Sequence, residues 1–80
     1  MEKVIKPGMQ FKNGSMDLTV LCFAENGGRN TALLICHDDG LFITVRNLGQ
    51  LESAYNWVWG HYFSDLKDAL KDYNKRKYEL

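Results

Sequence analysis

Three turn signals divide the first half of this chain into short apolar segments. Asn13–Gly14 separates two strand-like runs, two glycines follow each other in ENGGRN, and Gly40 ends the segment DDG. Glycine adopts the positive φ angles that tight turns need, and Asn-Gly is the strongest short signal for a type I′ hairpin. Strands joined by such short connections run antiparallel. The sequence therefore predicts an antiparallel meander.

Between the turns, apolar residues follow the two-residue period of strands. The predicted strands span residues 9–12, 16–24, 31–37, 41–46 and 55–59. In the last of them, Tyr55, Trp57 and Trp59 alternate with polar or smaller residues and are predicted to share one side. Residues 47–54 are polar and irregular, which predicts a loop or a single helical turn.

A helix is predicted over residues 65–77. Ser64 is a suitable N-cap, and acidic residues occupy the first turn, where the helix dipole favours negative charge. Leu66, Ala69, Leu70 and Tyr73 fall at the spacing of a single apolar stripe. This stripe needs an apolar platform, which either the Tyr55/Trp57/Trp59 side or Phe63 can supply.

Together these elements predict an α+β fold in a single domain over residues 1–80. An antiparallel β-meander of four to five strands carries one C-terminal α-helix packed on one face. The strands, however, are apolar on both faces, and one helix covers only one face. Either the sheet curls strongly or its second face meets another chain. The second alternative is favoured here, with a homodimer as one form of it.

The charge balance bears on the kind of partner. Ten basic and ten acidic residues give a formal net charge of zero, whereas proteins that bind duplex nucleic acid usually carry a basic excess. Nucleic acid is therefore disfavoured as a partner, although a zero net charge still allows a local basic patch. The first ten residues contain no apolar run typical of a signal peptide, and no segment has the length of a membrane helix. A cytoplasmic protein without membrane contact is predicted.

The two cysteines are predicted to be reduced. If residues 25–30 join two strands, Cys22 faces Leu33 and Cys36 faces Thr19, too far from Cys22 for a disulfide. A zinc site from these cysteines and the histidines lacks the usual ligand spacing. No metal and no cofactor are predicted.

No catalytic residues are predicted, and the chain is expected not to be an enzyme. The segment HDDG is explained by turn chemistry, and ENGGRN lacks the spacing of a phosphate-binding loop. Both cysteines lie in apolar strands, where a buried thiol is a poor nucleophile.

Six of the ten aromatic side chains lie between Tyr55 and Arg76. Aromatic residues and arginine dominate binding hot spots, so partner binding is predicted for a set of five residues. These are Trp57, Trp59, Tyr62, Arg29 and Arg46. Alternatively, Phe42, Tyr55, Trp57 and Trp59 stack single-stranded bases, with residues 75–77 as the basic tail. A third hypothesis is an oligomer that sequesters a small ligand between chains.

The segment from Trp57 to Arg76 follows the pattern WxWGxYFxxLxxALxxYxxR. It resembles the ends of small proteins carried by phages and mobile elements of Gram-positive bacteria. The resemblance implies a compact anti-CRISPR-like protein that binds a host protein or nucleoprotein complex in the bacterial cytoplasm. The implied function is non-enzymatic inhibition of a host defence complex. Anti-CRISPR proteins tend to be acidic and this chain is neutral, which favours steric blocking over DNA mimicry.

Overall fold

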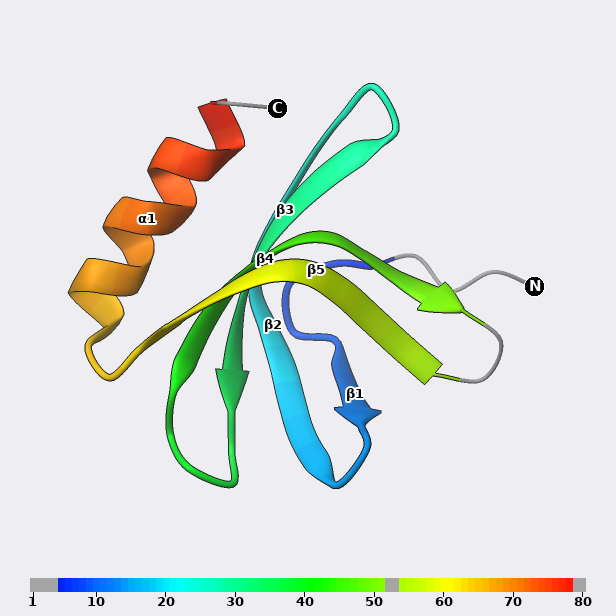
Figure 1. Cartoon of the computed structure of the whole chain (residues 1–80), viewed down its shortest axis with the longest axis vertical. Helices are drawn as coiled ribbons and strands as arrows, with labels where there is room; N and C mark the ends of the chain where they lie inside the picture. Colours follow the sequence, from blue (N-terminus) through cyan, green and yellow to red (C-terminus); the bar gives the residue numbers. More distant parts are fainter. Residues whose placement is uncertain (1–4, 52–53, 79–80) are drawn as a thin grey trace.

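The computed structural model describes residues 5–51 and 54–78 and contains one antiparallel sheet and one helix (Figure 1). The sheet has five strands in the order of the sequence. They are β1 (Gln10–Asn13), β2 (Met16–Asn26), β3 (Arg29–Cys36), β4 (Phe42–Leu51) and β5 (Ala54–Phe63), followed by α1 (Leu66–Tyr78). The predicted α+β meander with one packed helix is confirmed.

The first hairpin forms, but its turn lies one residue later than predicted. Asn13 pairs with Met16, so Gly14 and Ser15 are the central residues, and only Gly14 has a positive φ, of 61°. A glycine at the first central position is typical of a type II′ turn. The amide of Asn13 instead donates a hydrogen bond to the Tyr55 carbonyl at 3.1 Å, which ties the end of β1 to the start of β5.

The other two turns follow the predicted chemistry. Gly27 and Gly28 have φ angles of 58° and 83° and join β2 to β3 in a two-residue hairpin loop. After β3, Gly40 has a φ of 74° and donates its N–H to the Cys36 carbonyl at 2.8 Å. The Asp38 carboxylate accepts the N–H of Asp17, which fastens this turn to the start of β2.

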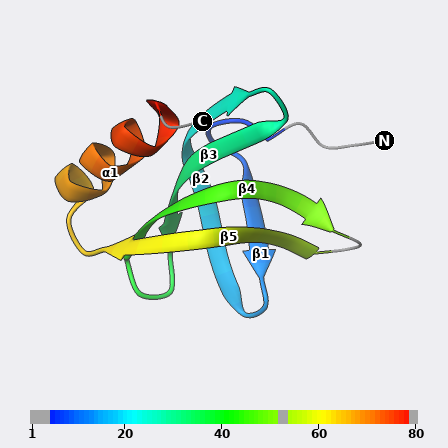
Figure 2. The same cartoon turned by 45° about the horizontal axis from the view of Figure 1, so that its top comes forward.

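The sheet curls until its first and last strands meet. Figures 1 and 2 show β4 and β5 crossing over β1 and β2, and the rings of Phe11 and Tyr55 lie 5.0 Å apart across the seam. Apolar side chains from all five strands fill the concave side: Phe11, Leu18, Val20, Ala32, Leu34, Cys36, Ile43, Val45, Leu48 and Tyr55. The sequence argument for a second chain on this face was wrong, because the chain itself covers it.

The helix covers part of the convex side. Ala69 and Tyr73 are buried against Leu33, with Phe63 and Leu70 packed beside them, so Phe63 belongs to the platform that the stripe requires. Asp65, not Ser64, caps the helix: its carboxylate accepts the N–H of Lys67 at 2.7 Å. Within residues 5–51 and 54–78, no helix has the length and apolar character of a membrane span.

Residues 47–51 continue β4, so the predicted loop is wrong over most of its length; residues 52 and 53 lie outside the described part. The side chain of Asn30 replaces a missing strand partner. Its amide donates to the Leu48 carbonyl at 3.0 Å, and its oxygen accepts the Leu48 N–H at 2.9 Å. This clamp holds the buried side chain of Leu48 in the inner cluster. The strand was missed because its two apolar residues in this segment, Leu48 and Leu51, are three positions apart and do not follow the two-residue period of a strand.

Cys22 and Cys36 are both free thiols. Cys22 does pair with Leu33, but a bulge between Val20 and Cys22 shifts the register, so Cys36 lies opposite Leu18 and not Thr19. Cys36 is in the inner cluster, whereas Cys22 packs on the helix side. The sheet itself therefore separates the two thiols.

Candidate functional site

Strand β5 contains a bulge at Trp59, which changes the side of the sheet to which its side chains point. Thr44 pairs with His61, but Arg46 pairs with Val58, so β5 holds one extra residue at this point. Trp59 has a φ of 49°, which is an outlier for a bulky side chain. Tyr55 and Trp57 pack on the inner cluster, whereas Trp59 is 72% exposed. The prediction that these three aromatics share a face was wrong, because the bulge breaks the alternation.

Arg76 of α1 forms hydrogen bonds to the backbone of this bulge from the helix side of the sheet. Its guanidinium donates to the Trp59 carbonyl at 2.6 Å through Nη2. Nη1 donates to the carbonyl and hydroxyl of Thr44 at 2.8 and 3.0 Å. Only 4% of Arg76 is exposed. One buried cation thus fixes the helix against β4 and β5 and satisfies the carbonyl of the strained residue.

Asp72 completes the network one helical turn earlier. Its carboxylate accepts a hydrogen bond from the Thr44 hydroxyl, and its Oδ2 lies 3.0 Å from His61 Nδ1. Burial alone raises the pKa of this carboxyl. The hydrogen bonds from Thr44 and His61, with the charges of His61 and Arg76, outweigh burial and hold the pKa of Asp72 below its ordinary value.

The arrangement of Thr44, Asp72 and His61 does not match nucleophilic catalysis. A catalytic triad places the histidine between the hydroxyl and the carboxylate, so that the imidazole takes the hydroxyl proton. Here the carboxylate lies between the other two groups, and the Thr44 side chain is completely buried. These contacts position the helix and the β5 bulge.

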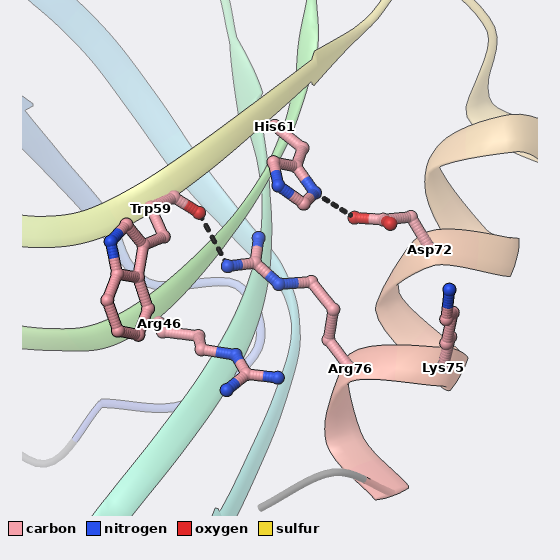
Figure 3. Close-up of a pocket in the computed structure, with 6 residues that line it drawn as sticks. All are labelled: Arg46, Trp59, His61, Asp72, Lys75 and Arg76. Atoms are coloured by element: carbon pink, nitrogen blue, oxygen red, sulfur yellow. Dashed lines mark hydrogen bonds and ion pairs between the residues drawn. The ribbon is translucent and has the colours of Figure 1, made fainter.

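Two hollows flank Trp59 and Arg46. The first, of about 240 Å³, is lined by Arg46, Trp59, His61, Asp72, Lys75 and Arg76. Figure 3 shows Arg46 and Trp59 on the sheet side of it and Lys75 on the helix side. The second, of about 180 Å³, is lined by Arg29, Arg46, Asn47 and Trp59. We call the residues of both hollows the Trp59 surface; they include four basic side chains and one acidic one.

The structure brings together three of the five residues predicted to bind a partner: Arg29, Arg46 and Trp59. Trp57 lies apart from them, partly buried against the inner cluster. Tyr62 is 56% exposed but lines neither hollow. The four aromatics of the predicted base-stacking platform also separate, because Phe42 packs on the helix side and Tyr55 is buried.

The sequence interpretation did not assign Thr44, His61, Asp72 and Arg76 to one site. A signal for Arg76 does exist in the helix period. Ala69, Tyr73 and Arg76 follow at i, i+4 and i+7, and these are the buried residues of α1. An arginine on the buried stripe predicts a partner inside the fold, because a buried charge needs one. No such pattern marks Trp59, whose backbone angle depends on the register of β4.

A further hollow, of about 480 Å³, lies at β1 and β2 and is lined by Gln10, Phe11, Lys12, Asp17, Leu18 and His37. Three of its polar side chains have partners: Lys12 Nζ lies 3.7 Å from the Asp17 carboxylate, and His37 Nε2 lies 2.6 Å from the Thr19 hydroxyl. Across the part of the chain that the structure describes, no three His, Cys, Asp or Glu side chains gather as a metal site would require.

None of the protein-family models, curated proteins or solved structures compared with this chain matches it. The resemblance of residues 57–76 to phage and mobile-element proteins therefore gains no support from relatives and stays a prediction. Any functional inference has to come from the Trp59 surface itself.

Proposed function

We propose that this chain is a non-catalytic binding protein whose Trp59 surface docks on an anionic region of a macromolecular partner. The observation that carries the proposal is the tryptophan held exposed at an unfavourable backbone angle among basic side chains. Folding alone gives no reason to keep an indole in water at such an angle.

The network behind Trp59 supports this function. Backbone strain persists only where surrounding contacts enforce it, and it concentrates at functional sites. Arg76, itself buried, bonds the Trp59 carbonyl, and Asp72 and Thr44 hold the same junction of helix and sheet. Because its backbone is already fixed, Trp59 loses less conformational entropy on binding than a residue of a flexible loop would.

The charges favour an anionic partner in spite of the zero net charge. Arg29 is the first residue of β3 and lines the Trp59 surface. Asp38 and Asp39 lie beyond the opposite end of the same strand, after Cys36. The balance of charge over the whole chain therefore conceals a local basic excess. Such a surface attracts negatively charged partners and speeds their association.

Inhibition of a host defence complex is one use of such docking. A nucleic-acid-binding host complex exposes basic grooves as well as bound anionic strands, and a small domain docked on such a strand would block it sterically. This more specific role rests on the resemblance of the tail alone. The docking itself does not depend on it.

Retention on an immobilised polyanion tests the docking function. Wild type is expected to bind heparin at low salt and to elute at higher salt than Arg29→Ala or Lys75→Ala, since salt weakens such contacts. Lys12→Ala is the matched control, because it removes the same formal charge from the distant β1–β2 hairpin. No retention of wild type, or an equal shift in all three variants, would contradict the proposal.

A further inference from the structure

We infer that the anionic partner is single-stranded nucleic acid, with one base stacked on the Trp59 indole and the neighbouring phosphates in the two flanking hollows. This inference rests on the proposed docking function and narrows it to one class of ligand. It differs from the predicted four-aromatic platform, since it uses one aromatic side chain.

The order of side chains across the surface favours this ligand. Arg29 lines one hollow, Lys75 lines the other, and Trp59 with Arg46 lines both. A basic group, an aromatic ring and a second basic group thus follow one another. A nucleotide strand offers the complementary order of phosphate, flat base and phosphate. An acidic peptide supplies the charges but has no ring at each repeat, so it leaves the indole without a partner.

The exposed indole of the Trp59 surface also favours a single strand over a duplex. Stacking requires the open face of a base, and bases within a duplex already stack on their neighbours. Besides Trp59, the smaller hollow is lined by Asn47 and two arginines, and arginine contacts to phosphates position a strand without reading its sequence. Recognition of this kind tolerates sequence, because every base has a flat face.

The number of basic side chains predicts the salt dependence. Arg29, Arg46 and Lys75 are the cations of the two hollows besides the buried Arg76. Arg29 and Lys75 are the exposed cations among them, and each phosphate neutralised on a single strand contributes about −0.7 to the slope of log K against log salt, so a slope of about −1.4 is expected. Arg29→Ala and Lys75→Ala should each make the slope shallower by about 0.7.

The experiment is a fluorescence titration of the intact chain with an oligothymidylate of about eight nucleotides. Inorganic polyphosphate and polyglutamate of similar charge serve as ligands without bases. Oligothymidylate is expected to quench the exposed Trp59 and to bind about tenfold more tightly than either polyanion, since only oligothymidylate offers a base that stacks on the indole.

Trp59→Gly is the decisive variant, because glycine accepts the φ of 49° and removes the ring without disturbing the backbone. Because this variant lacks the reporting indole, its affinities are measured by isothermal titration calorimetry, and it should lose the tenfold preference while keeping its affinity for polyphosphate. Trp59→Phe, which keeps a ring, should retain most of the preference. Circular dichroism and the remaining emission of Trp57 check that both variants are folded.

Three outcomes separate the two proposals. Preferential binding of oligothymidylate that depends on Trp59 supports single-stranded nucleic acid. Equal binding of all three polyanions, or tighter binding of polyphosphate or polyglutamate, overturns this inference but leaves the docking function standing. If none of these polyanions binds at low salt, the docking function and the inference both fail.

Discussion

The two tryptophans of β5 lie two residues apart and have opposite environments. Trp57 follows the alternation of the strand and packs against the inner cluster. Trp59 lies past the bulge, 72% exposed and with a positive φ. In a regular strand both would face the same side. One inserted residue thus converts a core position into a surface position. Trp57 stabilises the fold, whereas Trp59 is available for contact with a partner.

The support for each side chain differs in kind. Trp57 is held by apolar contacts, which are numerous and non-directional. The backbone of Trp59 is held by a directional contact from a buried charge, since Arg76 donates to its carbonyl. Loss of apolar contact should weaken the first region gradually, whereas loss of one cation should disrupt the second.

Arg76→Ala should lower the free energy of unfolding most, by about 3 kcal/mol, because it leaves the buried Thr44 carbonyl and the Trp59 carbonyl without this donor. For a domain of 80 residues this is a large fraction of the total stability. Urea unfolding measures the change. Arg76→Lys serves as the comparison, because it keeps the charge but not the forked geometry. Equal stability of Arg76→Ala and wild type would contradict the assigned role.

Trp57→Ala should destabilise by about 2 kcal/mol, since it removes a partly buried ring from the inner cluster. Its affinity for polyanions should stay unchanged as long as the chain is folded. Thermal unfolding and heparin retention together provide the check. A weaker retention with unchanged stability would show that Trp57, not Trp59, contacts the partner.

Gly60→Ala should destabilise by about 1 kcal/mol, because an added Cβ would lie 3.0 Å from Trp57 Nε1 and the packed indole must shift. Gly49→Ala in β4 is the matched control, since nothing lies within 4 Å of its added Cβ. Comparison of the two midpoints in urea gives the result. If both substitutions have the same effect, the contact with Trp57 does not restrict residue 60.

Trp59→Gly should leave stability unchanged or raise it by up to about 1 kcal/mol. A bulky residue in the left-handed region costs about 1–2 kcal/mol, which outweighs the backbone entropy that glycine adds. Little buried area is lost, since the side chain is mostly exposed. Urea unfolding tests the sign. A clear loss of stability would mean that the Trp59 ring supports the fold.

Asp72 should make stability sensitive to acid. Its pKa in the folded state lies below the ordinary value of 3.8, so its contribution is complete above that pH and declines as pH falls from 3.8 through the lower folded pKa. Asp72→Asn should be less stable than wild type at neutral pH, and the difference should shrink in this acidic range. Urea midpoints measured at several pH values provide the test. A constant difference would exclude the carboxylate as the cause.

Much of the fold could be predicted because local chemistry specifies it. Gly14, the pair Gly27 and Gly28, and Gly40 set three turns, the period of two set the strands, and the stripe from Ala69 to Tyr73 set the helix face. The errors occurred where a distant contact decides. Asn30 holds Leu48 in a strand across the sheet, and the closure of β1 on β5 covers a face that seemed to need a second chain.

The site was only partly predictable for the same reason. Residue type identified Arg29, Arg46 and Trp59, because arginine and tryptophan suit binding surfaces. Their assembly depends on the register shift between β4 and β5, which no residue in the sequence announces. Arg76 could have been identified from its place on the buried stripe. Its acceptors could not, since they are backbone carbonyls on another element.

The seam between β1 and β5 also has a kinetic consequence. All hydrogen-bonded strand pairs of the sheet are consecutive in the sequence. The four hairpins that they form close short loops and can form early. The contact of Phe11 with Tyr55 joins residues 44 positions apart. It can form only when all the strands between them are in place. We expect this closure to be the late, slow event of folding. Substitutions at the seam should then speed unfolding more than they slow the formation of the hairpins.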